Sequence, residues 1–386
     1  MNPVVERISG SLIREIAGKR KVGSIDLGLG EPTLLPTMVF LERALAKSEG
    51  LGLKYTVNAG DSELRASIAS HYRYPQLSTA DNVCVTTGSQ EAVYVTIKAL
   101  LDPAHDELLV VEPAFPAYAK MASLEGVRCR TVSMDAADDF AFDAQRILNA
   151  VTSRTRLVVI CSPCNPTGRV ITGEQARKLG HGLLARGAGP VYVLHDEIYR
   201  EQTYIEEAGH FAECYPHTIV TNSLSKSNAL TGLRLGWTLA SAEITAALVK
   251  THAWVTSCAS TFAQRVAQEI FSTPGALLEH ARWYREQAAS ASGVLERSGL
   301  RFVRPEGSFY ACVQLAEGTS SLAFAHRLAD EFDVIAIPGI AFGPCMEGWL
   351  RLSWVCVLDQ LAEGVSRIER LNSATGAASM QVSSTS

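Results

Sequence analysis

The chain has 386 residues, of which 47% are hydrophobic and 19% are charged, a composition typical of a globular protein with one large unit or two domains. Its net charge is −5 and neither sign is concentrated in a long block, so a nucleic-acid-binding surface is not expected. No apolar run approaches the roughly 18 residues that span a bilayer, and the N-terminal stretch has no continuous apolar segment, so neither a membrane anchor nor a signal peptide is expected.

Apolar runs typical of buried strands alternate along the chain with segments of helical periodicity. The strand-like runs cover residues 82–88, 106–113, 155–163, 191–197 and 217–226. Helical segments such as SQEAVYVTIKALL and EQARKLGHGLLARG lie between them. Strands joined through helices pair in parallel by right-handed crossovers, and strands buried on both faces are almost wholly apolar, as these are. The pattern predicts an α/β fold with a mostly parallel sheet flanked by helices.

A second, smaller region is predicted toward the C-terminus. After about residue 275 a long helical segment is followed by short strand candidates in FVRPEGSFYACVQL and WLRLSWVC. We therefore expect a large domain over residues 33–275 and a small α+β domain built from residues 1–32 and 276–372. The last stretch, residues 373–386, is small and polar and lacks periodicity, so we expect a disordered tail there.

Nine cysteines are scattered along the chain rather than arranged as a disulfide framework, which is typical of a cytoplasmic protein. Cys161 and Cys164 form a C-x-x-C pair. Zinc or redox chemistry there would need a second ligand pair or a helix N-terminus that activates the first thiol, whereas Pro163 lies within the pair and Pro166 follows it closely. We interpret both cysteines as structural, and no metal site is expected.

Polar residues gather where the predicted strands end, which is where open parallel sheets bind ligands. Gly88, Ser89 and Gln90 fall at a strand-to-helix turn, whose free N–H groups favour an anion, although a serine there is also an ordinary N-cap. The chain has no GxGxxG or GxxxxGK[ST] motif, so a nucleotide phosphate is not expected. Asp196 ends another strand, and a buried carboxylate needs a partner; a helix cap or a loop ion pair is the alternative.

Lys226 stands in the apolar, glycine-rich stretch SLSKSNALTGLRLGW. A lysine that is desolvated at a strand end has a lowered pKa and becomes an amine nucleophile. Arg234 supplies a fixed cation nearby, and Ser223 and Ser225 supply hydroxyl groups. A desolvated lysine, an anion site and a buried carboxylate at one sheet edge are the groups that pyridoxal 5′-phosphate requires.

The motifs LGLGEPT, YTVNAGDSELR, TTGSQEA, EPAFPAY, NPTG, DEIY, SLSKSNALTGLRLGW and LRLSW occur in this order along nearly the whole chain. Together they resemble the class I/II aminotransferases, which are fold-type I pyridoxal-phosphate enzymes. The resemblance implies that fold. It also implies a ping-pong transfer of an amino group from an L-α-amino acid to a 2-oxo acid through a Schiff base on Lys226.

The resemblance implies roles for the residues that hold the cofactor. Lys226 would carry it and move the substrate proton, and Asp196 would pair with the pyridine nitrogen. Asn165 and Tyr199 would hydrogen-bond the 3′-oxygen, and Phe115 would stack on the ring, although a phenylalanine there could also belong to the core. The phosphate would be held by Gly88, Ser89, Gln90, Ser223, Ser225 and Arg234.

The resemblance also concerns the substrate and the assembly. Arg351 would bind the substrate α-carboxylate through a bidentate fork, with Asn165 beside it. Gly30 would let the N-terminal segment pass close over the substrate. Tyr55 would reach the phosphate in the neighbouring subunit, which implies a homodimer with shared active sites.

Two alternatives remain open at this point. The same scaffold and lysine–aspartate pair also serve C–S lyases, cyclopropane-forming synthases and ring-closing enzymes, and the fold does not choose among them. A non-catalytic effector sensor is disfavoured because every inferred catalytic residue is present and because little chain precedes LGLGEPT. Two positions depart from the family pattern: His195, which should face away from Asp196 on its strand, and Cys164, which would line the pocket.

Overall fold

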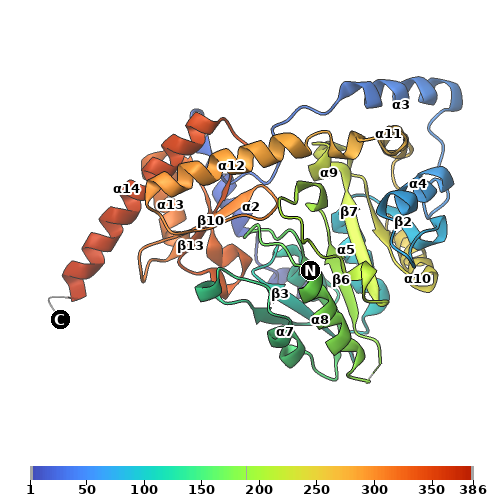
Figure 1. The fold of residues 1–386 in the computed structure, drawn as a ribbon, viewed down its shortest axis with the longest axis horizontal. Coiled ribbons are helices and arrows are strands. Elements are labelled where there is room, and N and C mark those ends of the chain that lie inside the picture. Colours follow the sequence, from blue (N-terminus) through green and yellow to red (C-terminus); the bar gives the residue numbers. More distant parts are fainter. Residues whose placement is uncertain (1–2, 188, 384–386) are drawn as a thin grey trace.

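The computed structural model describes residues 3–187 and 189–383. Its largest sheet lies at the centre of one half of the molecule and has the strand order β2-β8-β7-β6-β5-β3-β4 (Figure 1). The strands are Val83–Thr86 (β2), Glu107–Glu112 (β3), Arg128–Ser133 (β4), Thr155–Cys161 (β5), Tyr192–Asp196 (β6), Thr218–Ser223 (β7) and Gly236–Leu239 (β8).

The predicted parallel pairing is confirmed for most of this sheet. Strand β3 pairs in parallel with β4 and β5, β5 with β6, and β6 with β7. The exception is β8, which the sequence did not predict and which runs antiparallel to both β2 and β7. The carboxyl ends of β3, β5, β6 and β7 therefore lie at one edge of the sheet, where the candidate site forms.

Both faces of the sheet are buried, because alternate residues of the same strand pack in different cores. In β5, Leu157 and Val159 join one core and Val158 and Ile160 join the other. The helices of the large sheet region are Met38–Leu51 (α3), Ser62–Tyr72 (α4), Ser89–Leu100 (α5), Ala117–Leu124 (α6), Ala144–Ala150 (α7), Gly173–Leu184 (α8), Leu224–Ser227 (α9), Ala242–Val255 (α10) and Thr261–Ser272 (α11).

The other half of the molecule is built around two small sheets. One is antiparallel, with the order β12-β13-β10-β9, and the other pairs β1 with β11. Their strands are Ile25–Asp26 (β1), Phe302–Val303 (β9), Tyr310–Gln314 (β10), Val334–Ile335 (β11), Ile337–Pro338 (β12) and Trp349–Ser353 (β13). The helices here are Leu12–Ala17 (α2), Ala281–Ser298 (α12), Ser321–Phe332 (α13) and Leu358–Ser383 (α14). The short helix Pro3–Arg7 (α1) lies instead against α6 of the large sheet region.

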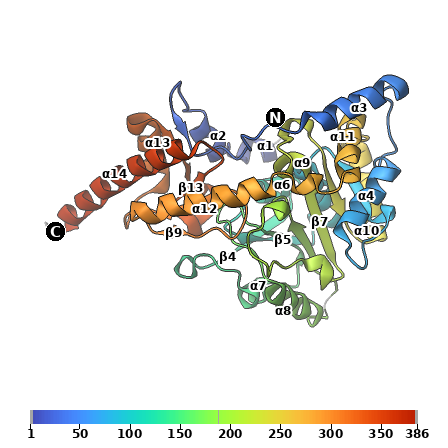
Figure 2. The ribbon, with the colours of Figure 1, turned by 45° about the horizontal axis from the view of Figure 1, so that its top comes forward.

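The N-terminal segment lies with the C-terminal region, because Ile25 pairs with Val334 and Asp26 with Ile335. The long helix α12 runs between the small sheets and α9 (Figure 2). The domain boundaries after residues 32 and 275 stay predictions. In the described part of the chain, no helix is both long and apolar enough to cross a membrane.

The C-terminus differs from the expected disordered tail over residues 373–386. Helix α14 continues through residues 373–383, and residues 384–386 lie outside the described part. A helix that has already nucleated extends at low cost, and the alanines, Met380 and Gln381 of this stretch favour helix, so the absence of an apolar stripe does not end it.

Candidate active site

Lys226 lies in α9, a single helical turn directly after β7, and not on the strand itself as the run 217–226 suggested. The strand ends at Ser223, whose hydroxyl accepts a hydrogen bond from the Ser225 amide at 3.1 Å and so caps the turn. The turn aims the lysine at the N-terminal segment, where its Nζ donates to the Gly30 carbonyl. Nζ also lies 5.7 Å from the centre of the Phe309 ring.

This environment changes the acidity of the lysine. Desolvation lowers the pKa of Lys226 from 10.5 to about 8. The Glu31 carboxylate opposes the change, whereas the Arg351 and Arg234 cations add to it. An amine with a pKa near 8 is about half unprotonated at pH 8 and about one-tenth unprotonated at pH 7, a far larger fraction than for an ordinary lysine, and the unprotonated form is the nucleophile.

Asp196 is a buried carboxylate that lacks a cationic partner among the described residues. It ends β6; its Oδ2 accepts from the Tyr118 hydroxyl at 2.6 Å and its Oδ1 from the Ile198 amide at 3.2 Å. Burial raises the pKa of Asp196 to about 6 despite these two hydrogen bonds. The site therefore has a place for a positively charged N–H group, such as that of a protonated pyridine.

A cradle for an anion lies at the N-terminus of α5. Gly88 caps this helix with a φ of 84°, and a Cβ atom there would lie 2.6 Å from Nη2 of Arg234. The Arg234 guanidinium therefore lies against the helix N-terminus, where the helix dipole also favours negative charge. Ser89 is half-buried and Gln90 is exposed in the first turn. These groups fit a phosphate.

Asn165, Tyr199 and Phe115 lie around the same sheet edge. Asn165 follows β5 and is buried, as is Tyr199, which follows Asp196. The Phe115 ring stands edge-on to the Tyr118 ring, with 6.1 Å between centroids, and so lies close to the tyrosine that contacts Asp196.

Arg351 is a fully buried arginine on β13 for which the described residues provide no acidic partner. Its Nη1 donates to Asn165 Oδ1 at 3.1 Å and its Nη2 donates to the Gly28 carbonyl at 2.6 Å, while Nε has no hydrogen-bond partner there. The guanidinium carbon lies 4.3 Å from the Tyr310 ring centroid and 5.0 Å from that of Phe342. A buried guanidinium without a counter-ion is costly, so the site has a place for a carboxylate.

Within a single chain, Gly30 lies at the site and Tyr55 does not. A Cβ atom at Gly30 would lie 2.8 Å from the Tyr310 hydroxyl, so this position admits only glycine without displacement of the tyrosine. Tyr55 is 88% exposed and does not join the site within one chain.

Four residues at the site were missed by the sequence reasoning: Tyr118, Glu31, Phe309 and Tyr310. Tyr118 stands three positions after Phe115 near the start of α6, and that helical spacing could have indicated it. The Tyr310 hydroxyl lies 3.2 Å from the Tyr199 hydroxyl, although the two residues are 111 positions apart, and no local pattern in the sequence indicates this contact.

His195 faces away from Asp196, as strand alternation predicted, and joins a buried network around Glu197. His195 Nδ1 and His210 Nδ1 lie 2.9 and 3.0 Å from Glu197 Oε1, and the Tyr74 hydroxyl donates to the same oxygen at 2.8 Å. By residue type, these two histidines and the glutamate could hold a metal ion. However, Arg200 Nη1 lies 2.7 Å from Glu197 Oε2 and already supplies the positive charge.

Burial alone would raise the pKa of Glu197, but His210, Arg200 and His195 together hold it well below its ordinary value. A metal ion would place a second cation beside Arg200 in a buried space. The network is therefore best explained as a framework that holds the segment between Asp196 and Arg200.

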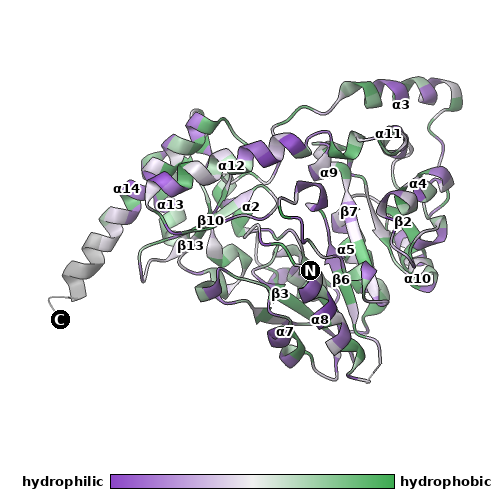
Figure 3. Cartoon of the chain, in the orientation of Figure 1, coloured by the Kyte–Doolittle hydropathy of each residue, from purple (hydrophilic) through white to green (hydrophobic). Residues whose placement is uncertain are grey.

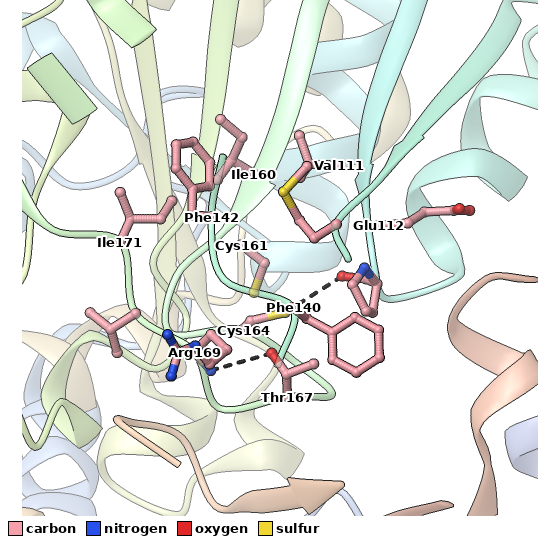
Figure 4. A pocket seen from close by; sticks show the side chains of 13 residues that line it. Val111, Glu112, Phe140, Phe142, Ile160, Cys161, Cys164, Thr167, Arg169 and Ile171 are labelled. Atoms are coloured by element: carbon pink, nitrogen blue, oxygen red, sulfur yellow. Dashed lines mark hydrogen bonds between the residues drawn. The ribbon is translucent and has the colours of Figure 1, made fainter. Parts of the chain in front are cut away.

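Cys161 and Cys164 line a small cavity of about 30 Å³ beside the ends of β3 and β5 (Figure 4). The Cys164 thiol donates to the Pro113 carbonyl at 3.5 Å and the Cys161 thiol to the Pro163 carbonyl at 3.3 Å. Burial raises the pKa of both thiols, which favours the unreactive protonated form. The cavity has room for about one water molecule, and Lys226, Asp196 and Arg351 are not among the residues that line it.

The site thus combines a desolvated lysine, an anion cradle, and a buried carboxylate and a buried arginine that have no oppositely charged partner among the described residues. The family model of aminotransferase class I and II matches residues 22–368. The chain belongs to this family. Among its relatives, the aspartate aminotransferase of Pyrococcus horikoshii is 30% identical over 94% of this chain and 95% of its own length. An aromatic-amino-acid aminotransferase of Thermococcus litoralis is 27% identical over 90% and 92%.

Solved structures of the family agree with the fold. The aspartate aminotransferase of Thermotoga maritima superposes with a TM-score of 0.89 at 28% identity, covering 96% of this chain and 99% of that one. The Thermus thermophilus aspartate aminotransferase with maleate gives the same TM-score, identity and coverage. The predicted family, the fold-type I architecture and the aminotransferase activity are confirmed, and the lyase or cyclase alternative is not favoured.

Proposed function

We propose that this aminotransferase binds pyridoxal 5′-phosphate at the carboxyl edge of its large sheet and transfers the amino group of an α-amino acid to a 2-oxo acid by a ping-pong mechanism. The bound cofactor would withdraw the electrons left on the substrate α-carbon when its C–H bond breaks. Lys226 would hold the cofactor covalently. Asp196 would face the ring nitrogen, and Asn165 and Tyr199 the 3′-oxygen.

The Lys226 amine serves two steps in this proposal. Because its pKa is about 8, a substantial unprotonated fraction is available to attach the cofactor. Once released, the same amine accepts the proton of the substrate α-carbon. Its hydrogen bond to the Gly30 carbonyl holds the amine against the segment that covers the site.

The phosphate would lie at the α5 N-terminus. The Gly88 backbone approaches the Arg234 guanidinium so closely that a side chain at position 88 would displace the guanidinium from the helix N-terminus. Ser89 and Gln90 stand in the first turn of the helix, and the buried Ser223 and Ser225 lie at the end of β7 and in the turn after it. Helix dipole and guanidinium together supply the positive potential for a dianion.

One observation supports the substrate class: Arg351 is buried and lacks an acidic partner in the described chain. The α-carboxylate of an amino acid or a 2-oxo acid would provide the missing charge through two parallel hydrogen bonds. Asn165, which accepts from Arg351, would contact both the substrate and the cofactor.

A homodimer is also part of the proposal. Hydrophobic residues are exposed along α3 and the segment after it, which Figure 3 shows at the edge of the molecule. They include Leu51, Leu53, Tyr55 and Val57, and Trp254 and Val255 at the end of α10 are exposed as well. The two segments lie together, because the Asn58 side chain donates to the Ser257 carbonyl at 2.7 Å. A second copy of the chain would cover this surface and bring Tyr55 to the partner's phosphate site.

A single turnover tests the reaction. The purified, cofactor-loaded protein is mixed with a panel of amino acids in the absence of a 2-oxo acid, and the cofactor is then analysed by mass. We expect pyridoxamine phosphate and one equivalent of the oxo acid. Recovery of pyridoxal phosphate beside a cleaved or cyclised product would contradict the proposal.

A further inference from the structure

We propose that Tyr310 is a positioning residue that orients Tyr199 through its hydroxyl group and Arg351 through its ring. This inference rests on the proposed function, because Tyr199 is proposed to contact the cofactor and Arg351 to bind the substrate carboxylate. Tyr310 would hold both residues in place. The sequence did not indicate Tyr310, and its position follows from the pairing of two strands.

The register of β10 and β13 brings Tyr310 to Arg351. Cys312 pairs with Arg351, and Tyr310 pairs with Ser353, in an antiparallel ladder. Residues two apart on a strand share a face, so Tyr310 and Arg351 are diagonal neighbours on one face of the small sheet. The guanidinium carbon lies 4.3 Å from the Tyr310 ring centroid, close enough for a cation–π contact in a buried site.

The Tyr310 ring orients the Arg351 guanidinium without neutralising its positive charge. An aspartate or glutamate partner would orient Arg351 equally well but would neutralise it and compete with a substrate carboxylate. An aromatic face fixes the plane of the guanidinium and leaves its outer N–H groups to Asn165, Gly28 and an incoming anion.

The hydroxyl of Tyr310 contacts Tyr199, which belongs to the proposed cofactor-binding part of the site. It lies 3.2 Å from the Tyr199 hydroxyl, and both tyrosines are buried. Either oxygen can donate, but a Tyr199 that donates its proton to the cofactor 3′-oxygen can only accept from Tyr310. In the loaded protein Tyr310 therefore donates to Tyr199 and strengthens its hydrogen bond to that oxygen.

Two substitutions in the cofactor-loaded protein separate these roles. Tyr310→Phe keeps the ring and removes the hydroxyl. Because Tyr199 then stabilises the anionic 3′-oxygen less well, we expect the pH midpoint of the bound cofactor's absorbance change to rise by about half to one pH unit. The KM for amino acids stays within about twofold, since Arg351 keeps its ring.

Tyr310→Leu removes the ring as well. We expect the KM for amino acids to rise about tenfold or more, because the guanidinium loses the face that orients it, whereas amines without a carboxylate lose less. If the leucine variant does not fold, Tyr310→Met fills a similar volume without a ring and gives the same comparison. Tyr215→Phe is the matched control: Tyr215 is buried and donates to the Val191 carbonyl, at the opposite end of the sheet.

The outcomes are distinct. An unchanged midpoint in Tyr310→Phe would overturn the role of the hydroxyl, and an unchanged amino acid KM in both ring-deleted variants would overturn the role of the ring. A midpoint that shifts equally in Tyr215→Phe would show a general effect of a lost buried hydroxyl and would also overturn the inference. If the unmodified protein neither binds the cofactor nor converts it, the proposed function fails instead.

Discussion

Arg351 and Asn165, 186 residues apart in the chain, are joined by a hydrogen bond of 3.1 Å from Nη1 to Oδ1. Arg351 belongs to the small antiparallel sheet and Asn165 follows β5 of the large sheet. This contact joins the two sheet regions at the place where we propose that the substrate carboxylate binds. A change at either residue should therefore affect substrate recognition.

The geometry of this arginine predicts the effect of Arg351→Lys. A lysine has a single ammonium group and cannot form the two parallel hydrogen bonds of a guanidinium. We expect the KM for amino acids to rise about 10-fold to 100-fold, with a smaller loss for amines that lack an α-carboxylate. Steady-state kinetics with both substrate types measure the difference. Arg301→Lys, at an exposed arginine near Trp349, is the control. Equal losses of activity with amino acids and with amines in R351K would contradict the role of Arg351 in carboxylate binding.

Lys226 should differ from ordinary lysines in its reactivity with pH. Since its pKa is lowered to about 8 in the cofactor-free protein, the unprotonated fraction is complete about one to two pH units above this value. We expect labelling of Lys226 by a small amine-reactive reagent to level off near pH 9, whereas exposed lysines react increasingly up to higher pH. Mass analysis of digested protein resolves the site. A Lys226 profile that coincides with that of the exposed lysines would argue against desolvation.

The variant Lys226→Ala tests the covalent role directly. We expect no detectable transamination, because both the attachment point of the cofactor and the proton acceptor are lost. The variant should still bind the cofactor non-covalently, since the proposed phosphate and ring contacts remain. Turnover near the wild-type rate in K226A would rule out the mechanism.

Asp196 should destabilise the cofactor-free protein. Its pKa is raised from 3.8 to about 6, so between these values the folded state binds more protons than the unfolded state and the free energy of unfolding falls as pH rises. Above pH 6 the buried carboxylate is ionised, and the free energy of unfolding is lowered by the full amount, on the order of 3 kcal/mol for a pKa difference of about two units. We expect cofactor-free Asp196→Asn to be more stable than wild type at pH 8 and to lose this advantage toward pH 4.

Chemical unfolding at several pH values measures this effect, and Asp138→Asn, at an exposed aspartate, is the control. The loaded D196N protein should turn over far more slowly, because a neutral amide can accept a hydrogen bond from the ring N–H but supplies no negative charge to keep the ring nitrogen protonated. A stability gain of the same size at pH 4 and pH 8 would show that ionisation is not the cause.

The exposed surface around α3 and α10 predicts an assembly-dependent activity. Trp254 is 89% exposed in the single chain, and Trp254→Asp should weaken the proposed dimer and lower activity in parallel. Sedimentation at several protein concentrations, with activity measured on the same samples, provides the test. Val22→Asp, at another exposed residue, should leave both unchanged. A W254D protein that is monomeric but fully active would show that the sites are not shared.

Much of the site could be predicted from local sequence. The strand-like runs that end near Gly88, Asp196 and Lys226 indicated a shared sheet edge, because parallel strands bring their carboxyl ends together whatever their exact order. The structure places all three at that edge, with Lys226 moved from the strand into the turn after it. Such local rules depend only on residues within one strand or one turn.

Other features were decided only by the tertiary structure. Tyr310 reaches Arg351 through the register of β10 and β13. Glu197 contacts Tyr74 from a segment 123 residues away, in addition to His195, Arg200 and His210 from its own part of the chain. The pKa changes of Lys226 and Asp196 likewise depend on what covers them. The sequence alone therefore determined the residue types, their order and the sheet edge at which they meet, because these follow from local periodicity. Partners, burial and charge balance were decided by packing between distant segments, which no local pattern records.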